Sequence, residues 1–136
     1  MDEEAILRAL QGGVTAAVAA STTPALPVSY INVGFNTPAD GKWLELVWLP
    51  NNIRGDLWGD DKNYRGILRM ILHWPNDGSG IYRPLALLGS ISDYFVKGRL
   101  LSGVQIYEKP DLTGAVFDGD ELLLPVSIRY QSYRKG

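Results

Sequence analysis

Residues 64–74 have the sequence YRGILRMILHW, in which two kinds of side chain alternate. One parity is apolar or small: Tyr64, Gly66, Leu68, Met70, Leu72 and Trp74. The other parity mixes charge with apolar residues: Arg65, Ile67, Arg69, Ile71 and His73. A period of two is typical of a strand that packs one face on a core and leaves the other partly in water. The stretch therefore predicts a half-buried β-strand, around which the rest of the fold can be placed.

A helix is predicted after this strand. Residues 75–80, PNDGSG, favour a turn because Pro, Asn, Asp and Gly adopt the backbone angles that turns need. The next apolar residues recur at spacings of three and four, which is typical of a helix with one face on a core. They are Ile81, Leu85, Leu88, Ile91 and Phe95. Pro84 is compatible with the first turn, and Lys97 and Gly98 suit the C-terminal end.

Residues 2–20 predict a first helix. Its apolar face consists of Ile6, Leu7, Leu10, Val14, Ala17 and Val18. Gly12 and Gly13 each cost a helix about 1 kcal/mol relative to alanine. We therefore expect either that the helix frays there or that another backbone packs closely against it.

The remaining strands are predicted from apolar runs at residues 28–34, 42–49, 103–108 and 122–133. Pro125 should lie at a strand start, an edge or a bulge, because it has no N–H to donate. The expected fold class is α+β, in the order α-β-β-β-α-β-β. We expect one domain over residues 1–136, with one mostly antiparallel or mixed sheet of about five strands and both helices on one face.

Composition limits the possible functions. The chain has 136 residues, 46% of them hydrophobic, which is enough for one core. It has no cysteine, so it can form neither a disulfide nor a thiolate metal site. The formal net charge of -2 argues against nucleic acid as the main ligand. No apolar run is long enough for a membrane span, and the N-terminus is acidic, so we expect a protein that is cytosolic when made.

The chemistry-bearing residues do not form a recognisable active site. His73 is the only histidine, so a catalytic triad would have to centre on it. Ser79 lacks the G-x-S-x-G pattern of a nucleophile elbow and is expected to be a turn or helix N-cap residue, with His73 on the partly exposed strand face. No phosphate-binding glycine motif is present. We expect no catalytic, cofactor-binding or metal-binding residue, and therefore no enzyme.

Charged residues are expected to be mostly solvated. The acidic clusters are Asp56, Asp60 and Asp61, and Asp118, Asp120 and Glu121; their spacing does not match a calcium-binding loop. Arg65 and Arg69 share one strand face, while Arg129 lies in the last predicted strand. Such scattered cations predict no sequence-specific binding of nucleic acid.

Residues 50–63, PNNIRGDLWGDDKN, form a long irregular segment, and loops of this length inside compact domains are often functional. Aromatic residues and arginine dominate the energetics of protein–protein contacts. Ile53, Arg54, Leu57 and Trp58 therefore suggest such a contact. Alternatively, the segment folds back and inserts Trp58 to cap one end of the sheet.

The chain resembles the tail-terminator, or tail-completion, proteins of long-tailed bacteriophages. The similarity is carried by four stretches that together cover most of the chain: EEAILRAL, KWLELVWLPN, YRGILRMILHWPNDGSGIYRPLALLGSISDYF and LLLPVSIRYQSY. These are patterns of shape and not catalytic motifs.

The resemblance implies an α+β subunit that is monomeric or weakly associated in solution and needs no cofactor. It further implies assembly in the host cytoplasm as a hexameric ring on the end of the tail tube, which becomes part of the virion tail. Its partners would be other copies of itself, the tail-tube protein and the head–tail connector proteins. Ring closure requires a head-to-tail interface, in which one patch meets a different patch on the neighbour.

We hypothesise that residues 51–63, with Ile53, Arg54, Leu57 and Trp58, supply one assembly patch. Arg65 and Arg69 would form a second one, facing a neighbouring subunit or the lumen through which DNA passes. Composition alone selects these residues. Two alternatives are a neck or head-completion adaptor of the same particle and a small hydrolase that uses His73 with an aspartate.

Overall fold

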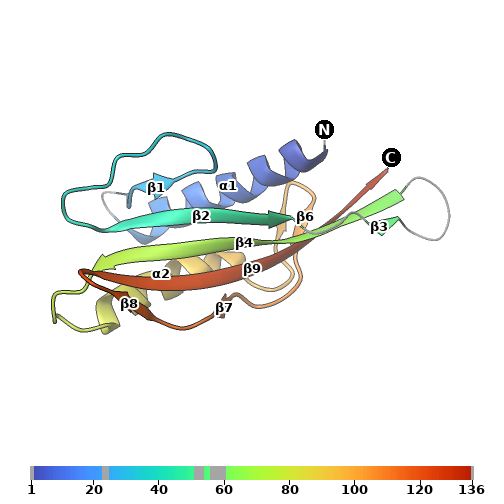
Figure 1. Cartoon of the computed structure of the whole chain (residues 1–136). Helices are drawn as coiled ribbons and strands as arrows, with labels where there is room; N and C mark the ends of the chain where they lie inside the picture. The colour runs from blue at the N-terminus through green and yellow to red at the C-terminus, as the bar shows by residue number, and fades with distance from the viewer. Residues whose placement is uncertain (1, 23–24, 51–53, 56–60, 136) are drawn as a thin grey trace.

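The computed structural model describes residues 2–22, 25–50, 54–55 and 61–135, with the backbone alone at residues 2, 54–55, 61–63 and 133–135. Within this part, the structure has two α-helices, one 3-10 helix and nine strands (Figure 1). Their bounds are α1 Asp2–Ser21, β1 Val28–Ser29, β2 Trp43–Pro50, β3 Arg54–Gly55, β4 Asp61–Pro75, α2 Tyr82–Ser92, η1 Asp93–Phe95, β5 Leu100–Leu101, β6 Val104–Ile106, β7 Asp111–Leu112, β8 Val116–Asp118 and β9 Glu121–Lys135.

The sheet is built on one long antiparallel pair. β4 and β9 pair over their full lengths, from Asp61 opposite Lys135 to Pro75 opposite Glu121. Each has 15 residues, so at ~3.3 Å per residue the pair is roughly 50 Å long. The strand order is β1-β2-β4-β9-β6-β5, with β3 on β4 and with β7 and β8 on β9. Because β1 runs parallel to β2, the sheet is mixed, as expected.

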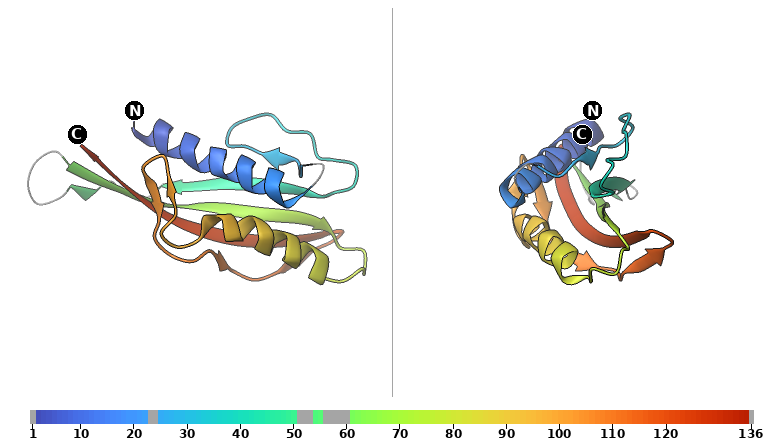
Figure 2. Two further views of the ribbon diagram at one scale, coloured as in Figure 1. Left: turned by 180° about the vertical axis from the view of Figure 1, so that it is seen from behind. Right: turned by 90° about the vertical axis from the view of Figure 1, so that its left-hand side faces the viewer.

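Both helices cover one face of the sheet, which curls around them (Figure 2). Ser90 Oγ of α2 donates to Ser21 Oγ of α1 at 3.1 Å, so the helices lie side by side. The alternation in β4 is confirmed: Leu68, Met70 and Leu72 are fully buried beneath the helices, while the intervening residues up to Ile71 are half-buried. The predicted apolar faces of both helices also point into this core, except that Leu7 of the first helix is not among the core residues.

The strand count and element order differ from the prediction. The sheet has nine strands instead of about five. The additional strands β3, β5, β7 and β8 are only two or three residues long, which is too short for a period of two to appear in the sequence. β1 spans two residues instead of the expected seven; the chain reverses soon after it, at Asn32, which has φ 55°.

The paired glycines of α1 neither fray the helix nor contact another backbone. α1 is continuous from Asp2 to Ser21. A Cβ at Gly13 would lie 3.0 Å from Leu101 Cδ1 and 3.1 Å from Phe95 Cε1. The absence of a side chain at Gly13 therefore leaves room for the side chains of Leu101 and Phe95. A Cβ at Gly12 would meet nothing within 4 Å.

Gly66 makes room for a buried tyrosine. Tyr130 lies opposite Gly66 in the β4–β9 pair and is almost fully buried. A Cβ at Gly66 would lie 2.8 Å from Tyr130 Cζ and 2.9 Å from the carbonyl oxygen of Leu49. The Tyr130 hydroxyl accepts a hydrogen bond of 2.9 Å from Trp48 Nε1, and burial raises the pKa of the phenol above its usual value. This contact ties β2 to β9 across β4.

Pro125 lies inside β9 and faces an interruption in the neighbouring edge. The N–H of Thr113 donates to the carbonyl of Pro125 at 3.1 Å, so that carbonyl points toward the connection between β7 and β8. In an antiparallel strand the N and C=O of one residue point to the same side. The missing N–H therefore faces this connection and not β4. Pro125 is inside a strand with partners on both sides and in continuous register with β4, so the expected position at a strand start, an edge or a bulge is wrong.

Candidate assembly interface

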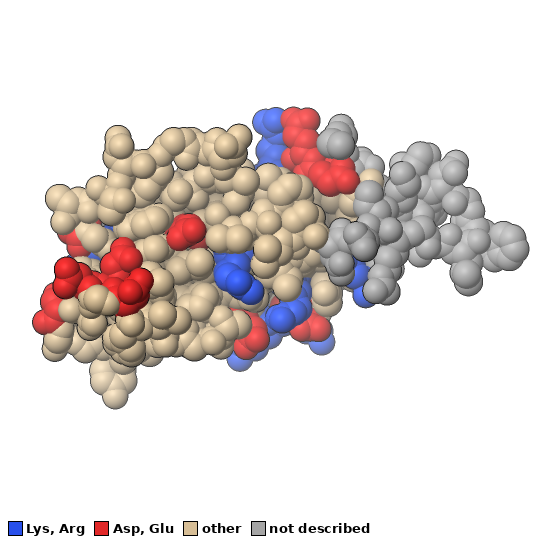
Figure 3. All heavy atoms as spheres, in the orientation of Figure 1, with Lys and Arg blue, Asp and Glu red and all other residues tan. Residues whose placement is uncertain are grey.

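Three arginines gather on the outer face of the sheet, away from the helices. Arg129 of β9 lies opposite Ile67 of β4, and Arg65 and Arg69 flank Ile67 on the same face. Diagonal neighbours of this kind are separated by ~7–8 Å, which is within reach of long side chains. Arg65, Arg69 and Arg129 are called the arginine cluster below. Figure 3 shows blue atoms near the middle of this face.

The positive charge of the arginine cluster is only partly compensated within the described residues. The Nε atoms of Arg65 and Arg69 are buried without a hydrogen-bond partner there. The Arg65 guanidinium lies 5.6 Å from the centre of the Tyr107 ring. Arg129 Nε lies 3.8 Å from Glu108 Oε2, and such a partly exposed pair contributes little to stability.

The surface around the arginine cluster is hollowed. One hollow of about 200 Å³ is lined by Leu49, Pro50, Arg65, Gly66, Ile67, Tyr107 and Arg129. A second, of about 550 Å³, is lined by Lys97, Glu108, Lys109, Pro110, Asp111 and Arg129. The first is smaller than the roughly 300–1,000 Å³ of typical small-molecule sites. It is large enough to receive protein side chains.

An acidic surface lies at the far end of the sheet, where Pro75 pairs with Glu121. Asp118 is the last residue of β8, and Asp120 lies in the turn that leads to β9. This turn touches the turn after β4, because the N–H of Asn76 donates to the carbonyl of Asp120 at 2.8 Å. Asp77, Asp118 and Asp120 are called the acidic tip below. Figure 3 shows red atoms gathered at this end.

The acidic tip is exposed to solvent at Asp77, Asp118 and Asp120. Asp77 Oδ1 accepts hydrogen bonds from the hydroxyl of Ser79 at 2.6 Å and from its N–H at 3.0 Å, and these hold the pKa of Asp77 below its usual value. Ser79 is thus a turn residue; the residue that caps α2 is Ile81.

Apolar side chains are exposed next to the acidic tip. Leu112 of β7 is 45% exposed, and Val116 and Phe117 of β8 are 49% and 62% exposed. Aromatic residues are enriched in protein–protein contacts relative to the rest of the surface.

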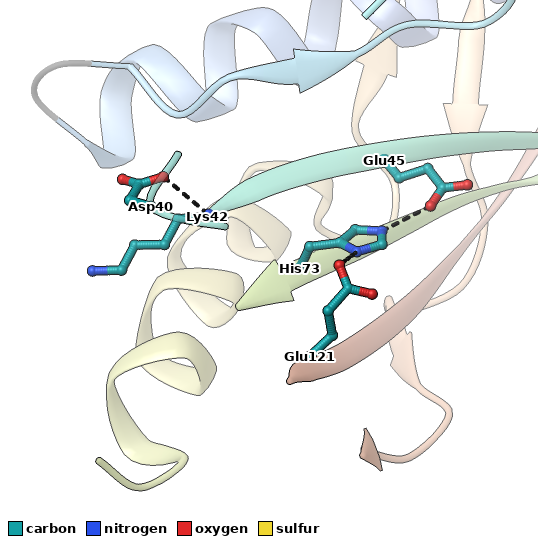
Figure 4. Close-up of polar contacts among 5 residues, drawn as sticks. All are labelled: Asp40, Lys42, Glu45, His73 and Glu121. Atoms are coloured by element: carbon teal, nitrogen blue, oxygen red, sulfur yellow. Dashed lines mark hydrogen bonds and ion pairs between the residues drawn. The ribbon is translucent and has the colours of Figure 1, made fainter. Parts of the chain in front are cut away.

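His73 lies between two carboxylates instead of in a catalytic pocket (Figure 4). Its Nε2 is 2.8 Å from Glu45 Oε1 of β2, and its Nδ1 is 3.5 Å from Glu121 Oε1 of β9. The ring stacks on Trp43 with centroids 3.8 Å apart. His73 is therefore on the expected face, but it is only 7% exposed and not partly exposed.

This arrangement does not support the hydrolase alternative. The carboxylates next to His73 are glutamates and not an aspartate, and they face different ring nitrogens. The Ser79 hydroxyl is hydrogen-bonded to Asp77. Within the described residues, no group of three or more His, Asp or Glu side chains could hold a metal ion.

Most of the predicted assembly patch lies outside the described residues. This applies to Ile53, Leu57 and Trp58, and to Asp56 and Asp60 of the first acidic cluster. The backbone of Arg54 belongs to β3 and pairs with Asn63 of β4. Of the hypothesised residues, only Arg65 and Arg69 have side chains that the structure describes.

The expectation of scattered basic residues is wrong for Arg129, which joins Arg65 and Arg69 on one face. The signal is the parity of β9: Arg129 is on the same side of the strand as Leu123 and Gln131, opposite to the buried residues Ile128 and Tyr130. Aligning that parity with β4 would have placed the three arginines on one face.

Comparisons with known proteins agree with this architecture. One solved structure is 25% identical in sequence and superposes with a TM-score of 0.77, covering 97% of this chain and 96% of the other chain. A search of curated proteins found no match. No helix among the described residues is long and apolar enough to cross a membrane.

A family model described as "Phage tail terminator protein" matches residues 5–130. This range includes α2, α1 from residue 5 onward, and the residues of both charged surfaces. The match confirms the resemblance inferred from the sequence. The chain therefore belongs to a phage tail terminator family, and its role is that of a structural protein of the phage tail.

Proposed function

We propose that the protein caps the end of the tail tube as a ring, stops polymerisation of the tube and supports joining of the tail to the head. The family match over residues 5–130 carries this proposal. The subunit would assemble in the host cytoplasm as a hexamer and remain in the virion tail. Its partners would be further copies of the chain, the tail-tube protein and the head–tail connector proteins.

The distribution of charge is compatible with a ring. A closed ring of identical subunits needs two different patches that fit each other. The acidic tip and the arginine cluster are such a pair, because they are unlike in charge and lie at different positions along the β4–β9 pair.

Residues 51–63 are the proposed contact for joining, with Ile53, Arg54, Leu57 and Trp58 as its main side chains. This segment follows β2 and contains β3 and the first three residues of β4, and Arg65 lies two residues after it. The proposed patch and the arginine cluster would therefore belong to one end of the subunit.

The decisive experiment mixes the purified protein with isolated tail tubes and, separately, with filled heads, and images the products by electron microscopy. Rings at the ends of tubes support a tail terminator. Binding to heads and not to tubes would favour a neck or head-completion adaptor of the same particle.

Replacing Trp58 with alanine tests the joining contact. We expect the variant to fold, to give the same unfolding transition as the parent and to lose at least about tenfold in tail joining, because truncating an aromatic anchor costs 2 kcal/mol or more. Tyr82→Ala is a matched control, because Tyr82 is 86% exposed at the start of α2. If Trp58→Ala unfolds, Trp58 caps the sheet and the contact proposal fails.

A further inference from the structure

We infer that the ring closes by docking the acidic tip of one copy onto the arginine cluster of the next copy. The inference rests on the proposed ring, and it names the two surfaces that meet. The occupant of the arginine cluster is thus a second copy of this chain, which contributes Asp118 and Asp120 together with the neighbouring Phe117.

The chemistry of the two surfaces is complementary. Arginine presents several N–H donors in a planar fork that matches a carboxylate, and such pairs can form two parallel hydrogen bonds. Within the described part of the chain, the only ion pair of Arg65, Arg69 and Arg129 is the 3.8 Å contact of Arg129 with Glu108. Asp118 and Asp120 are exposed on either side of Gly119, whose φ of 59° sets the turn.

The two surfaces cannot neutralise each other within one subunit. Asp118 pairs with Glu121, and Arg129 lies eight residues further along β9. At ~3.3 Å per residue the separation along the strand is roughly 26 Å. The Debye length at physiological salt is about 8 Å, so the charges are screened from each other within the chain. They remain available for contacts between molecules.

Apolar groups accompany the charges on both sides. Phe117 and Val116 are 62% and 49% exposed at the acidic side. The hollow of about 200 Å³ beside Arg65 and Arg129 is lined in part by Leu49, Pro50, Ile67 and Tyr107, although more of its exposed surface is polar than apolar. A few residues contribute most of the energy of a protein–protein contact, and aromatic and arginine side chains are common among them. This pairing favours a protein occupant over DNA, which would leave Phe117 exposed.

The test reverses the charge of each surface in a separate variant. The tip variant is Asp118→Arg with Asp120→Arg, and the cluster variant is Arg65→Glu with Arg129→Glu. In either variant alone, every proposed interface brings like charges together, which costs several kcal/mol. We expect the protein concentration needed for half-maximal ring assembly to rise by roughly 100-fold or more.

Mixing the two variants in equal amounts should restore assembly. In an alternating ring, the reversed tip of one variant meets the reversed cluster of the other, and the remaining interfaces are those of the parent. Native mass spectrometry of rings grown alone or on tail tubes should show both variants in equal numbers. Asp93→Arg and Arg83→Glu are matched controls, because both residues are exposed and belong to neither surface; each should assemble like the parent.

The outcomes separate the inference from the proposed function. If the parent forms rings but the mixture does not, the inference is wrong and the proposed function stands. If the parent forms no ring on tail tubes, the proposed function itself fails. If the cluster variant assembles normally but loses DNA binding or head joining, the cluster faces DNA or a connector and the inference is again wrong.

A second measurement keeps the test valid if a charge variant misfolds. The chain has no cysteine, so Val116→Cys with Gln131→Cys introduces the only thiols and leaves the charges unchanged. Gln131 pairs with Arg65, and Val116 lies two residues from Asp118. A short bismaleimide should link the double variant into a ladder of multimers. Each single-cysteine variant should remain unlinked. If the double variant gives no ladder of multimers, the inference is wrong.

Discussion

The neighbouring Tyr130 restricts position 66 to glycine. The absence of a side chain allows the Tyr130 ring to cross β4 and reach Trp48. A methyl group at this position would overlap with the ring and with the backbone carbonyl of Leu49, and the carbonyl cannot move without breaking the pairing of β2 with β4.

Gly66→Ala should therefore lower the free energy of unfolding by roughly 1–3 kcal/mol or more, the usual cost of overpacking a core. Urea unfolding followed by tryptophan fluorescence measures it. Gly34→Ala is the control, because a Cβ there would meet nothing within 4 Å. Equal stability of both variants would mean that Tyr130 can move aside.

At the level of elements, α1 depends on one close approach. Gly13 faces Phe95 of η1 and Leu101 of β5, while its neighbour Gly12 faces open space. The two glycines are adjacent in the sequence, so their intrinsic cost to the helix is the same and only the packing differs.

The Gly13→Gln substitution should lower the free energy of unfolding by roughly 1–3 kcal/mol, because the new side chain would push α1 away from η1 and β5. The Gly12→Gln substitution should instead raise the free energy of unfolding by several tenths of a kcal/mol to about 1 kcal/mol, because glutamine has a higher helix propensity than glycine. Thermal unfolding by circular dichroism compares the pair. A gain of stability in both variants would contradict the close approach.

The elements also show which parts of the fold the sequence can predict. The long strand β4 and both helices were predicted because their periods extend over many residues. The short strands β5, β7 and β8 have too few residues for a period, and their positions depend on pairing with β9. The burial of His73 comes from stacking on Trp43 of another strand, which no local pattern reveals. The arginine cluster likewise depends on the pairing of β4 with β9.

At the scale of the whole molecule, charges of opposite sign lie far apart on a chain whose net charge is only -2. Long-range attraction between copies is therefore expected to depend on salt. The Debye length falls from about 10 Å at 0.1 M to about 3 Å at 1 M salt.

Ring assembly should weaken by at least about tenfold when sodium chloride is raised from 0.1 M to 1 M, because the interface loses roughly 1.4 kcal/mol or more of attraction between charges. Light scattering against protein concentration measures this effect, and urea unfolding at both salt concentrations controls for changes in fold stability. Assembly that strengthens with salt would indicate an interface dominated by apolar contacts.

The central position of β9 has a consequence for biosynthesis. β9 pairs with β4, β6, β7 and β8, so a nascent chain that ends before residue 121 lacks the partner that these strands share. Pairing of β4 with β9 joins residues as far apart as 61 and 135, and such non-local contacts form slowly. Ribosomes must therefore finish translating β9 before β6, β7 and β8 can join the sheet.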